Sequence, residues 1–323
     1  MTPLPDDARA AARRAGRGAA ALAFAAWALI VIGALVRAHG AGLSCPDWPL
    51  CRGQLVPDFD ARVALEWGHR LMAGTLSLGV AALAFAVLRR PELRVRFGRS
   101  LALVFALLGV QVVLGGLTVL LGLAPWTVTG HLLTGNAFAL ALAWLARDAL
   151  DAARAADRLP VKLSANALRT VWLTCALVGL QLVLGGLVSS HYAGLACAAF
   201  PSCNGDSLAP TLHGPVGLHV LHRSNAYGVA VAFALLAWQL RAAGPAGRLA
   251  WTGLRLVLLQ VAVGAANVLL RLPVEVTALH SALAAAIFLT TGLLAREALA
   301  AARATQENVA GAARERHALG GAR

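Results

Sequence analysis

The sequence predicts an all-α integral membrane protein whose eight transmembrane helices form two tandem four-helix bundles. Three observations lead to this prediction: the composition, eight long apolar segments and an internal duplication. Of the 323 residues, 59% are hydrophobic and 13% are charged, and the mean hydropathy is +0.70. A soluble globular domain has about 25% charged residues. Most of the surface of this chain must therefore face lipid.

Eight apolar segments are each long enough to cross a bilayer, which takes roughly 20 helical residues for about 30 Å of hydrocarbon. They cover 19–38, 63–88, 100–121, 127–146, 170–190, 216–240, 250–270 and 275–295. The arginine-rich stretch before the first segment imitates a signal peptide. No small-residue cleavage site follows the segment, so we expect it to remain as the first helix.

The basic residues are distributed unevenly between the two sides of the predicted membrane domain. With the N-terminus inside, the cytoplasmic stretches contain 22 of the 28 Lys and Arg residues. The positive-inside rule then places both termini in the cytoplasm, and we expect a multi-pass protein of the bacterial inner (cell) membrane. The net charge of +13 is explained by this topology, so it does not indicate nucleic-acid binding.

The second half of the sequence repeats the first. The matching stretches are 33–45 with 185–197, 66–70 with 219–223, and 111–131 with 260–280. Four helices per half is an even number, so the two halves have the same orientation and are related by a pseudo-twofold axis along the membrane normal. The predicted organisation is an N-terminal tail (1–18), a first half (19–146), a linker (147–169), a second half (170–296) and a C-terminal tail (297–323). Both tails and the linker are expected to be cytoplasmic.

Four histidines occupy repeated positions in the even-numbered helices: His69, His131, His222 and His280. These helices run from outside to inside, and each histidine lies shortly after its helix begins, so all four have a similar depth. Two imidazoles that face each other at one height can hold a heme iron. We expect the pairs His69 with His131 and His222 with His280. The alternatives are interhelical hydrogen bonding and a proton relay.

The residues around the first histidine of each half differ in one respect. Glu66 lies three residues before His69, on the same helix face, whereas the matching position in the second half is His219. This difference predicts proton chemistry at the first site only, although Glu66 could simply pair with a nearby arginine. Arg70 and Arg223 follow the histidines and are candidates for binding heme propionates, or for snorkelling to the interface.

Two cysteine pairs lie in matching outer loops, Cys45 with Cys51 and Cys197 with Cys203. Each pair can form a disulfide on the oxidising side of the membrane, either as a structural link or with a redox role. A zinc site that also uses His39 and His191 is less favoured, because the pairs lack CxxC spacing. Cys175 has no partner and is expected to be a small core residue.

The ordered set of these features resembles the heme A synthase family over about residues 22 to 296. The set comprises Glu-x-x-His-Arg in the second helix, His-x-x-His-Arg in the sixth, single histidines in the fourth and eighth, and the paired loop cysteines. The resemblance implies an oxidoreductase that converts a ring methyl of heme O to a formyl group by successive hydroxylations, giving heme A for terminal oxidases.

The resemblance also implies a role for each half. His222 and His280 would bind a heme b cofactor, His69 and His131 would take the substrate heme O, Glu66 would be catalytic, and the family's loop cysteines correspond to Cys45 and Cys51. A heme O synthase is a candidate partner, and an electron-transfer partner and a homo-oligomer remain open. The main alternative is a bis-histidine heme b electron-transfer cytochrome, and a further one is a transporter with a histidine proton relay.

Overall fold

The described chain consists of eight long helices and one short 3-10 helix. The computed structural model describes residues 4–154, 163–205 and 207–320. The helices are α1 (Asp6–Ala38), α2 (Ala61–Leu88), α3 (Pro91–Leu120), α4 (Pro125–Ala152), α5 (Ala165–Ser190), η1 (Ala193–Leu195), α6 (Gly214–Gln239), α7 (Gly244–Leu269) and α8 (Val274–Gly320). All eight α-helices are long and apolar enough to span a membrane, which confirms the predicted fold class.

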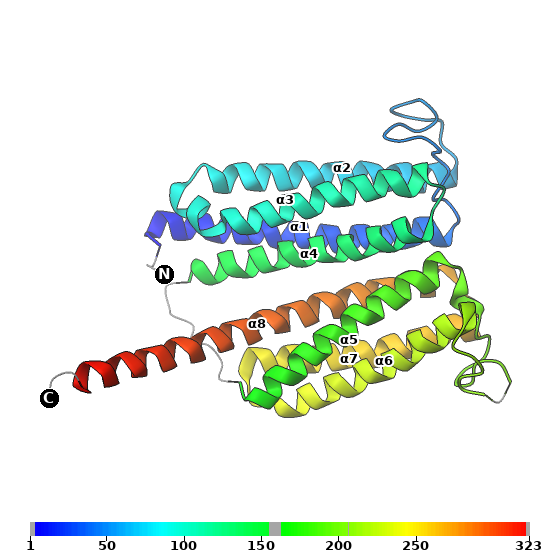
Figure 1. The fold of residues 1–323 in the computed structure, drawn as a ribbon. Helices are drawn as coiled ribbons and strands as arrows, with labels where there is room; N and C mark the ends of the chain where they lie inside the picture. The colour runs from blue at the N-terminus through cyan, green and yellow to red at the C-terminus, as the bar shows by residue number, and fades with distance from the viewer. Residues whose placement is uncertain (1–3, 155–162, 206, 321–323) are drawn as a thin grey trace.

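The helices lie in two groups of four, α1–α4 and α5–α8 (Figure 1). Separate hydrophobic cores hold the groups together: residues of α1–α4 form one around Phe97, and residues of α5–α8 form another around Phe233. Both termini lie at one end of the molecule. The α1–α2 and α5–α6 loops lie at the opposite end. The arrangement agrees with the duplication, while the twofold axis itself stays a prediction.

Local signals in the sequence fix where several helices begin. The carboxylate of Asp60 accepts hydrogen bonds from the backbone N–H groups of Arg62 and Val63 and so caps α2. Ser164 caps α5 in the same way through the N–H of Ala167. A proline occupies the first turn of α3, α4, α6 and α7, where its missing N–H leaves no helical hydrogen bond unmade.

Two short turns of the same form close the α3–α4 and α7–α8 hairpins. Gly122 and Leu123 have φ values of 57° and 62°, and Arg271 and Leu272 have φ values of 64° and 61°. In each turn the second residue donates its N–H to a carbonyl in the last turn of the preceding helix, at 2.8 Å for Leu123 and 2.7 Å for Leu272. These left-handed turns reverse the chain within a few residues.

Two helices extend beyond the apolar runs that predicted them. Helix α1 begins at Asp6 rather than near residue 19, and α8 continues through the 297–323 stretch to Gly320. Both extensions are rich in Ala and Arg, which favour helix, so the backbone stays helical where the apolar character ends. Part of the predicted 147–169 linker, residues 155–162, lies outside the described residues.

The two groups of helices contact each other through α1 and α4 on one side and α5 and α8 on the other. The indole N–H of Trp27 donates to the Ala282 carbonyl at 3.0 Å, and that of Trp144 donates to the Gly292 carbonyl at 2.9 Å. Near the end that carries the termini, Arg296 of α8 pairs with Asp148 at 2.8 Å. The halves are therefore joined along the part of α8 between Ala282 and Arg296.

Candidate heme sites

The structure places the four histidines on α2, α4, α6 and α8, toward the end of the molecule that carries the loops. The rings of His222 and His280 face each other, with centroids 6.5 Å apart and planes inclined at 57°. This placement agrees with the predicted pairing of the second half, while the pairing of His69 with His131 stays a prediction.

The spacing of the second pair fits a metal ion between the rings. Two imidazoles bound on opposite sides of one metal, through bonds of about 2 Å each, have centroids roughly 6.3 Å apart. The Nδ1 atoms of His69, His131 and His280 are shielded from solvent and have no hydrogen-bond partner among the described residues. A buried ring nitrogen that no protein group satisfies suits a bound ligand. The residues present therefore fit a bis-histidine heme.

Glutamines on neighbouring helices contact three of the four histidines. The Gln111 amide nitrogen lies 3.2 Å from Nε2 of His131, and that of Gln181 lies 3.2 Å from Nδ1 of His222. Gln260 donates to the backbone carbonyl of His280 at 3.0 Å, and Gln181 also donates to that of His222 at 3.1 Å. The amides of Gln111 and Gln181 thus direct a donor at an imidazole nitrogen.

The orientation of two of these amides is set from the histidine's own helix. Thr134, three residues after His131, donates to the Gln111 amide oxygen at 2.6 Å. Asn225, three residues after His222, donates to the Gln181 amide oxygen at 2.7 Å. Because the oxygen is occupied, the amide nitrogen must point toward the ring.

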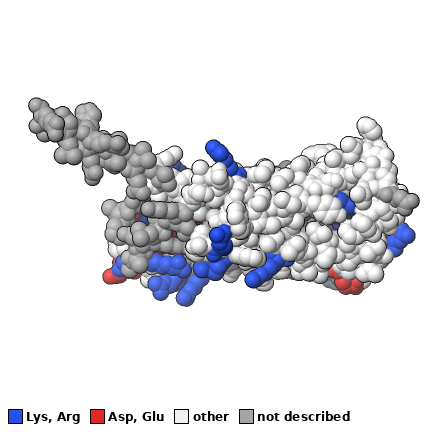
Figure 2. Space-filling model, turned by 90° about the horizontal axis from the view of Figure 1, so that it is seen from below, with Lys and Arg blue, Asp and Glu red and all other residues white. Residues whose placement is uncertain are grey.

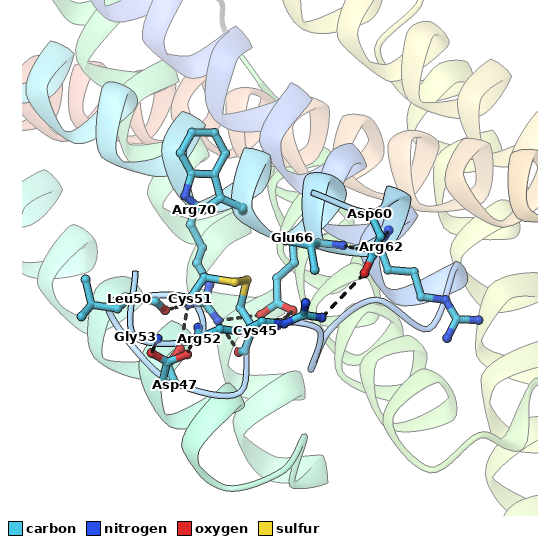
Figure 3. Close-up of a disulfide and its surroundings, with 12 residues drawn as sticks. Cys45, Asp47, Leu50, Cys51, Arg52, Gly53, Asp60, Arg62, Glu66 and Arg70 are labelled. Carbon is cyan, nitrogen blue, oxygen red and sulfur yellow. Dashed lines mark hydrogen bonds and ion pairs between the residues drawn. A yellow bond between two sulfur atoms is a disulfide. The ribbon is translucent and has the colours of Figure 1, made fainter. Parts of the chain in front are cut away.

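Glu66 and Arg70 form a buried ion pair that holds the first disulfide loop (Figure 3). Glu66 is only 4% exposed, and its Oε1 accepts from Arg70 at 2.6 Å. Its Oε2 accepts the backbone N–H of Cys45 at 2.9 Å. The same guanidinium donates to the carbonyls of Cys45, Asp47 and Leu50 at 2.6–2.8 Å. The expectation that Glu66 could pair with a nearby arginine is confirmed.

The second half repeats this arrangement without the carboxylate. Arg223 donates to the carbonyls of Cys197, Ala199 and Ser202 at 2.9–3.1 Å. His219, at the position that corresponds to Glu66, accepts the backbone N–H of Cys197 at 3.3 Å. Both arginines thus fasten a loop to the helix that carries a heme-ligand candidate.

Each cysteine pair forms a disulfide, Cys45 with Cys51 and Cys197 with Cys203, and all four residues are at most 1% exposed. Burial prevents access by external thiols, which favours the structural role over the redox role. The cysteines are then not available as thiolates for zinc. No group of three or more His, Cys, Asp or Glu residues that could hold a metal ion occurs in the described part of the chain.

Asp47 organises the tip of the first loop. Its two carboxylate oxygens accept the backbone N–H groups of Gly53 at 2.8 Å and Arg52 at 2.5 Å. The hydrogen bond from Gly53 is the main cause that lowers the pKa of Asp47 below its usual 3.8. This residue was not among those that the sequence singled out, because its partners lie five and six residues further along an irregular loop.

Comparison with known proteins assigns the chain to a family. Residues 19–291 match the COX15-CtaA family, described as cytochrome oxidase assembly protein. The chain belongs to this family. A heme A synthase from Shewanella oneidensis is 31% identical over 303 residues, a match that covers 81% of this chain and 90% of that protein. A heme A synthase from Methylobacterium radiotolerans is 30% identical over 321 residues, covering 83% and 86%.

A shorter match concerns a protein of a different description. A protein from Halobacterium salinarum named protoheme IX farnesyltransferase is 36% identical over 129 residues, which cover 39% of this chain and 28% of that protein. The similarity to heme A synthases of COX15-CtaA type, in contrast, extends over most of both chains. Family membership therefore rests on the full-length matches.

Proposed function

We propose that this protein is an oxidoreductase of heme A biosynthesis, which oxidises a ring methyl group of heme O to a formyl group by successive hydroxylations and provides heme A for terminal oxidases. The observation that carries the proposal is the match to proteins named heme A synthase over about nine-tenths of their length, in a chain whose second half brings two histidine rings together. An eight-helix membrane domain suits a substrate as apolar as a heme.

The two halves have different roles in this proposal. His222 and His280 hold a heme b, which supplies one-electron transfer when bound. His69 and His131 hold the substrate heme O. The assignment follows from the buried carboxylate, which lies beside His69, while the corresponding residue beside His222 is a histidine.

Glu66 is proposed to move a proton during methyl oxidation. Its two oxygens each accept one protein hydrogen bond, and a carboxylate oxygen can accept a second one from a substrate group or water. The bonds from Arg70 and Cys45 fix the orientation of the carboxylate, which a proton-transfer group requires.

The hydrogen bonds that the two arginines already make limit how they could bind a heme propionate. Four hydrogen bonds from the two Nη atoms of Arg70 go to Glu66 and the loop carbonyls. A propionate would have to displace one of them or use Nε. We therefore propose loop fastening as the main role of Arg70 and Arg223, with propionate binding as the secondary role.

The proposed location is the bacterial cell membrane with both termini in the cytoplasm. Most Lys and Arg side chains on the face in Figure 2 gather toward the end of the molecule that carries the termini, as the positive-inside rule requires. The two disulfides lie at the opposite end, which would face the oxidising side. The Halobacterium relative named protoheme IX farnesyltransferase supports a heme O-producing enzyme as partner.

The first experiment is to purify the protein in detergent after coexpression with a heme O synthase, and to extract and separate its hemes. Heme A or hydroxylated heme O together with heme b supports the proposal. Heme b alone would favour the electron-transfer cytochrome, and the absence of any heme band would favour a histidine proton relay.

The variant Glu66→Gln tests the proton-transfer role while preserving side-chain shape. We expect heme A formation to fall about 100-fold or more, as for loss of an acid–base group, with heme b content unchanged. The control is Glu275→Gln, which makes the same change at an exposed carboxylate in the first turn of α8, at the same end of the molecule. Normal heme A formation by Glu66→Gln would contradict the role.

A further inference from the structure

Each of the four histidine rings lies with its Cε1 edge against a helical glycine of the preceding helix. A methyl group built on that glycine would lie 3.1–3.2 Å from Cε1 in every case. The four contacts are Gly33 with His69 (3.2 Å), Gly115 with His131 (3.1 Å), Gly185 with His222 (3.2 Å) and Gly264 with His280 (3.1 Å).

These distances are too short for a side chain to be accommodated without movement. Carbon atoms in van der Waals contact are about 3.5–4.0 Å apart. An added methyl at Gly264 would therefore push the imidazole of His280 away by several tenths of an ångström. A ligand site tolerates displacements of only about 0.5 Å.

The contact recurs although the connections between the paired helices differ. A long disulfide-containing loop separates Gly33 from His69, whereas a short left-handed turn separates Gly115 from His131. The same ring edge nevertheless meets the same residue type. The contact is therefore a property of the helix pair and does not follow from the loop.

Glycine in a helix interior is unfavourable unless something requires it, by about 1 kcal/mol relative to alanine. At Gly109 and Gly179, in contrast, a side chain would have free space. They lie on α3 and α5, six residues before Gly115 and Gly185, and a methyl group on either would meet nothing within 4 Å.

We propose that Gly33, Gly115, Gly185 and Gly264 are positioning residues for the four imidazoles. Each leaves the space that a ring edge occupies, so that the ring settles at one height and angle relative to its partner. The inference rests on the proposed heme ligation and adds the residues that set its geometry. The 57° angle and 6.5 Å separation of His222 and His280 are the quantities that the glycines control.

The test compares Gly185→Ala and Gly264→Ala with the matched control Gly179→Ala. Heme b content, the low-spin electron paramagnetic resonance spectrum and the midpoint potential are measured in purified protein, because the spectrum depends on the angle between the two ring planes. We expect both test variants to shift the spectrum or to lose heme b severalfold. Gly179→Ala should match the wild type.

The glycines of the first half give an independent comparison. Gly33→Ala and Gly115→Ala should leave the heme b signal unchanged while lowering the retention of heme O severalfold, and Gly109→Ala should change neither. This selectivity by half is not expected if the glycines act only in general helix packing.

Three outcomes would overturn the inference. An unchanged heme b spectrum, potential and content in Gly185→Ala and Gly264→Ala would exclude positioning while leaving the proposed function intact. Loss of fold in these variants, seen by circular dichroism and thermal unfolding, would assign the glycines to packing. A wild-type protein without a low-spin heme signal would remove the ligation itself, and the proposed function with it.

Discussion

Glu66 and Arg70 join three features at one place: the helix that carries His69, the first disulfide loop and a buried carboxylate. The side chains are 5% and 17% exposed and lie 2.6 Å apart. A buried carboxylate without its cation is strongly destabilising. The second half has the same clamp with the uncharged His219 in place of the carboxylate. Removal of Arg70 would therefore leave a buried charge without its partner, whereas removal of Arg223 would not.

We predict that Arg70→Ala destabilises the protein more than Arg223→Ala. Loss of Arg70 leaves Glu66 buried and unpaired, at about 3–5 kcal/mol. Loss of Arg223 removes hydrogen bonds to carbonyls only, at about 1–3 kcal/mol. Thermal unfolding in detergent measures the difference.

The double variant Arg70→Ala with Glu66→Gln separates the charge from the hydrogen bonds. It should be more stable than Arg70→Ala alone, because the unpaired charge is gone. Equal instability of the single and double variants would show that Glu66 has another partner for its charge.

At the scale of the helix, the short hairpins show how one backbone conformation is achieved with different residues. The α3–α4 turn uses Gly122 at φ 57°, which glycine adopts without strain. The α7–α8 turn uses Arg271 at φ 64°, where a side chain costs about 1 kcal/mol or more. The first position of the turn is therefore strained in one half and relaxed in the other.

We predict opposite effects of substitution at these two positions. Arg271→Gly should stabilise the protein by up to about 1 kcal/mol, and Gly122→Ala should destabilise it by about the same amount. A methyl at Gly122 meets nothing within 4 Å, so only the backbone conformation is tested. Gly98→Ala, in the interior of α3 and equally unobstructed, is the control and should be neutral or stabilising. The same sign for both turn variants would contradict the argument.

Particular residues show which parts of the site the sequence could predict. The positions of His222 and His280 followed from the duplication and helix direction, because residue depth depends only on the rise per residue. The loop contacts of Arg70 did not follow, since they depend on the path of an irregular loop. Gly33 was visible in the repeat, but its contact with His69 depends on how α1 and α2 rotate about their axes. A shared Gln-x-x-x-Gly pattern before three of the histidines was the signal that could have revealed the glutamines.

At the scale of the whole molecule, α8 belongs to both halves. Its Leu294 and Ala298 lie in the core of α5–α8, while its Leu289 packs against a core cluster of α1–α4. The helix that carries His280 therefore also forms part of the surface that joins the halves. A proposed substrate site in one half and a cofactor site in the other require that the two groups of helices keep a fixed relation.

Arg296 is one of the charged residues that fasten α8 to α4, beside the Arg147–Glu297 ion pair. Its side chain is 18% exposed and pairs with Asp148 at 2.8 Å and with Asp151 at 2.7 Å. Asp148 is 43% exposed and Asp151 is 22% exposed, so solvent screens part of the attraction. Arg296→Gln leaves the acidic pair without this cation, and we expect a loss of about 1–2 kcal/mol in the free energy of unfolding.

The comparison variant is Arg303→Gln, which removes the same charge about two turns further along α8 at an exposed position. Thermal unfolding should separate the two, with a lower transition temperature for Arg296→Gln only. Heme b content should stay unchanged in both, because Arg296 lies 16 residues after His280 on α8, about 24 Å along the helix axis. If Arg296→Gln unfolds like the wild type, the remaining contacts hold the halves together. These are the apolar contacts, the indole hydrogen bonds of Trp27 and Trp144, the hydrogen bonds from Arg37 to Ser189 and the Arg147–Glu297 ion pair. The ion pair of Arg296 would then act only in orienting the end of α4 against α8.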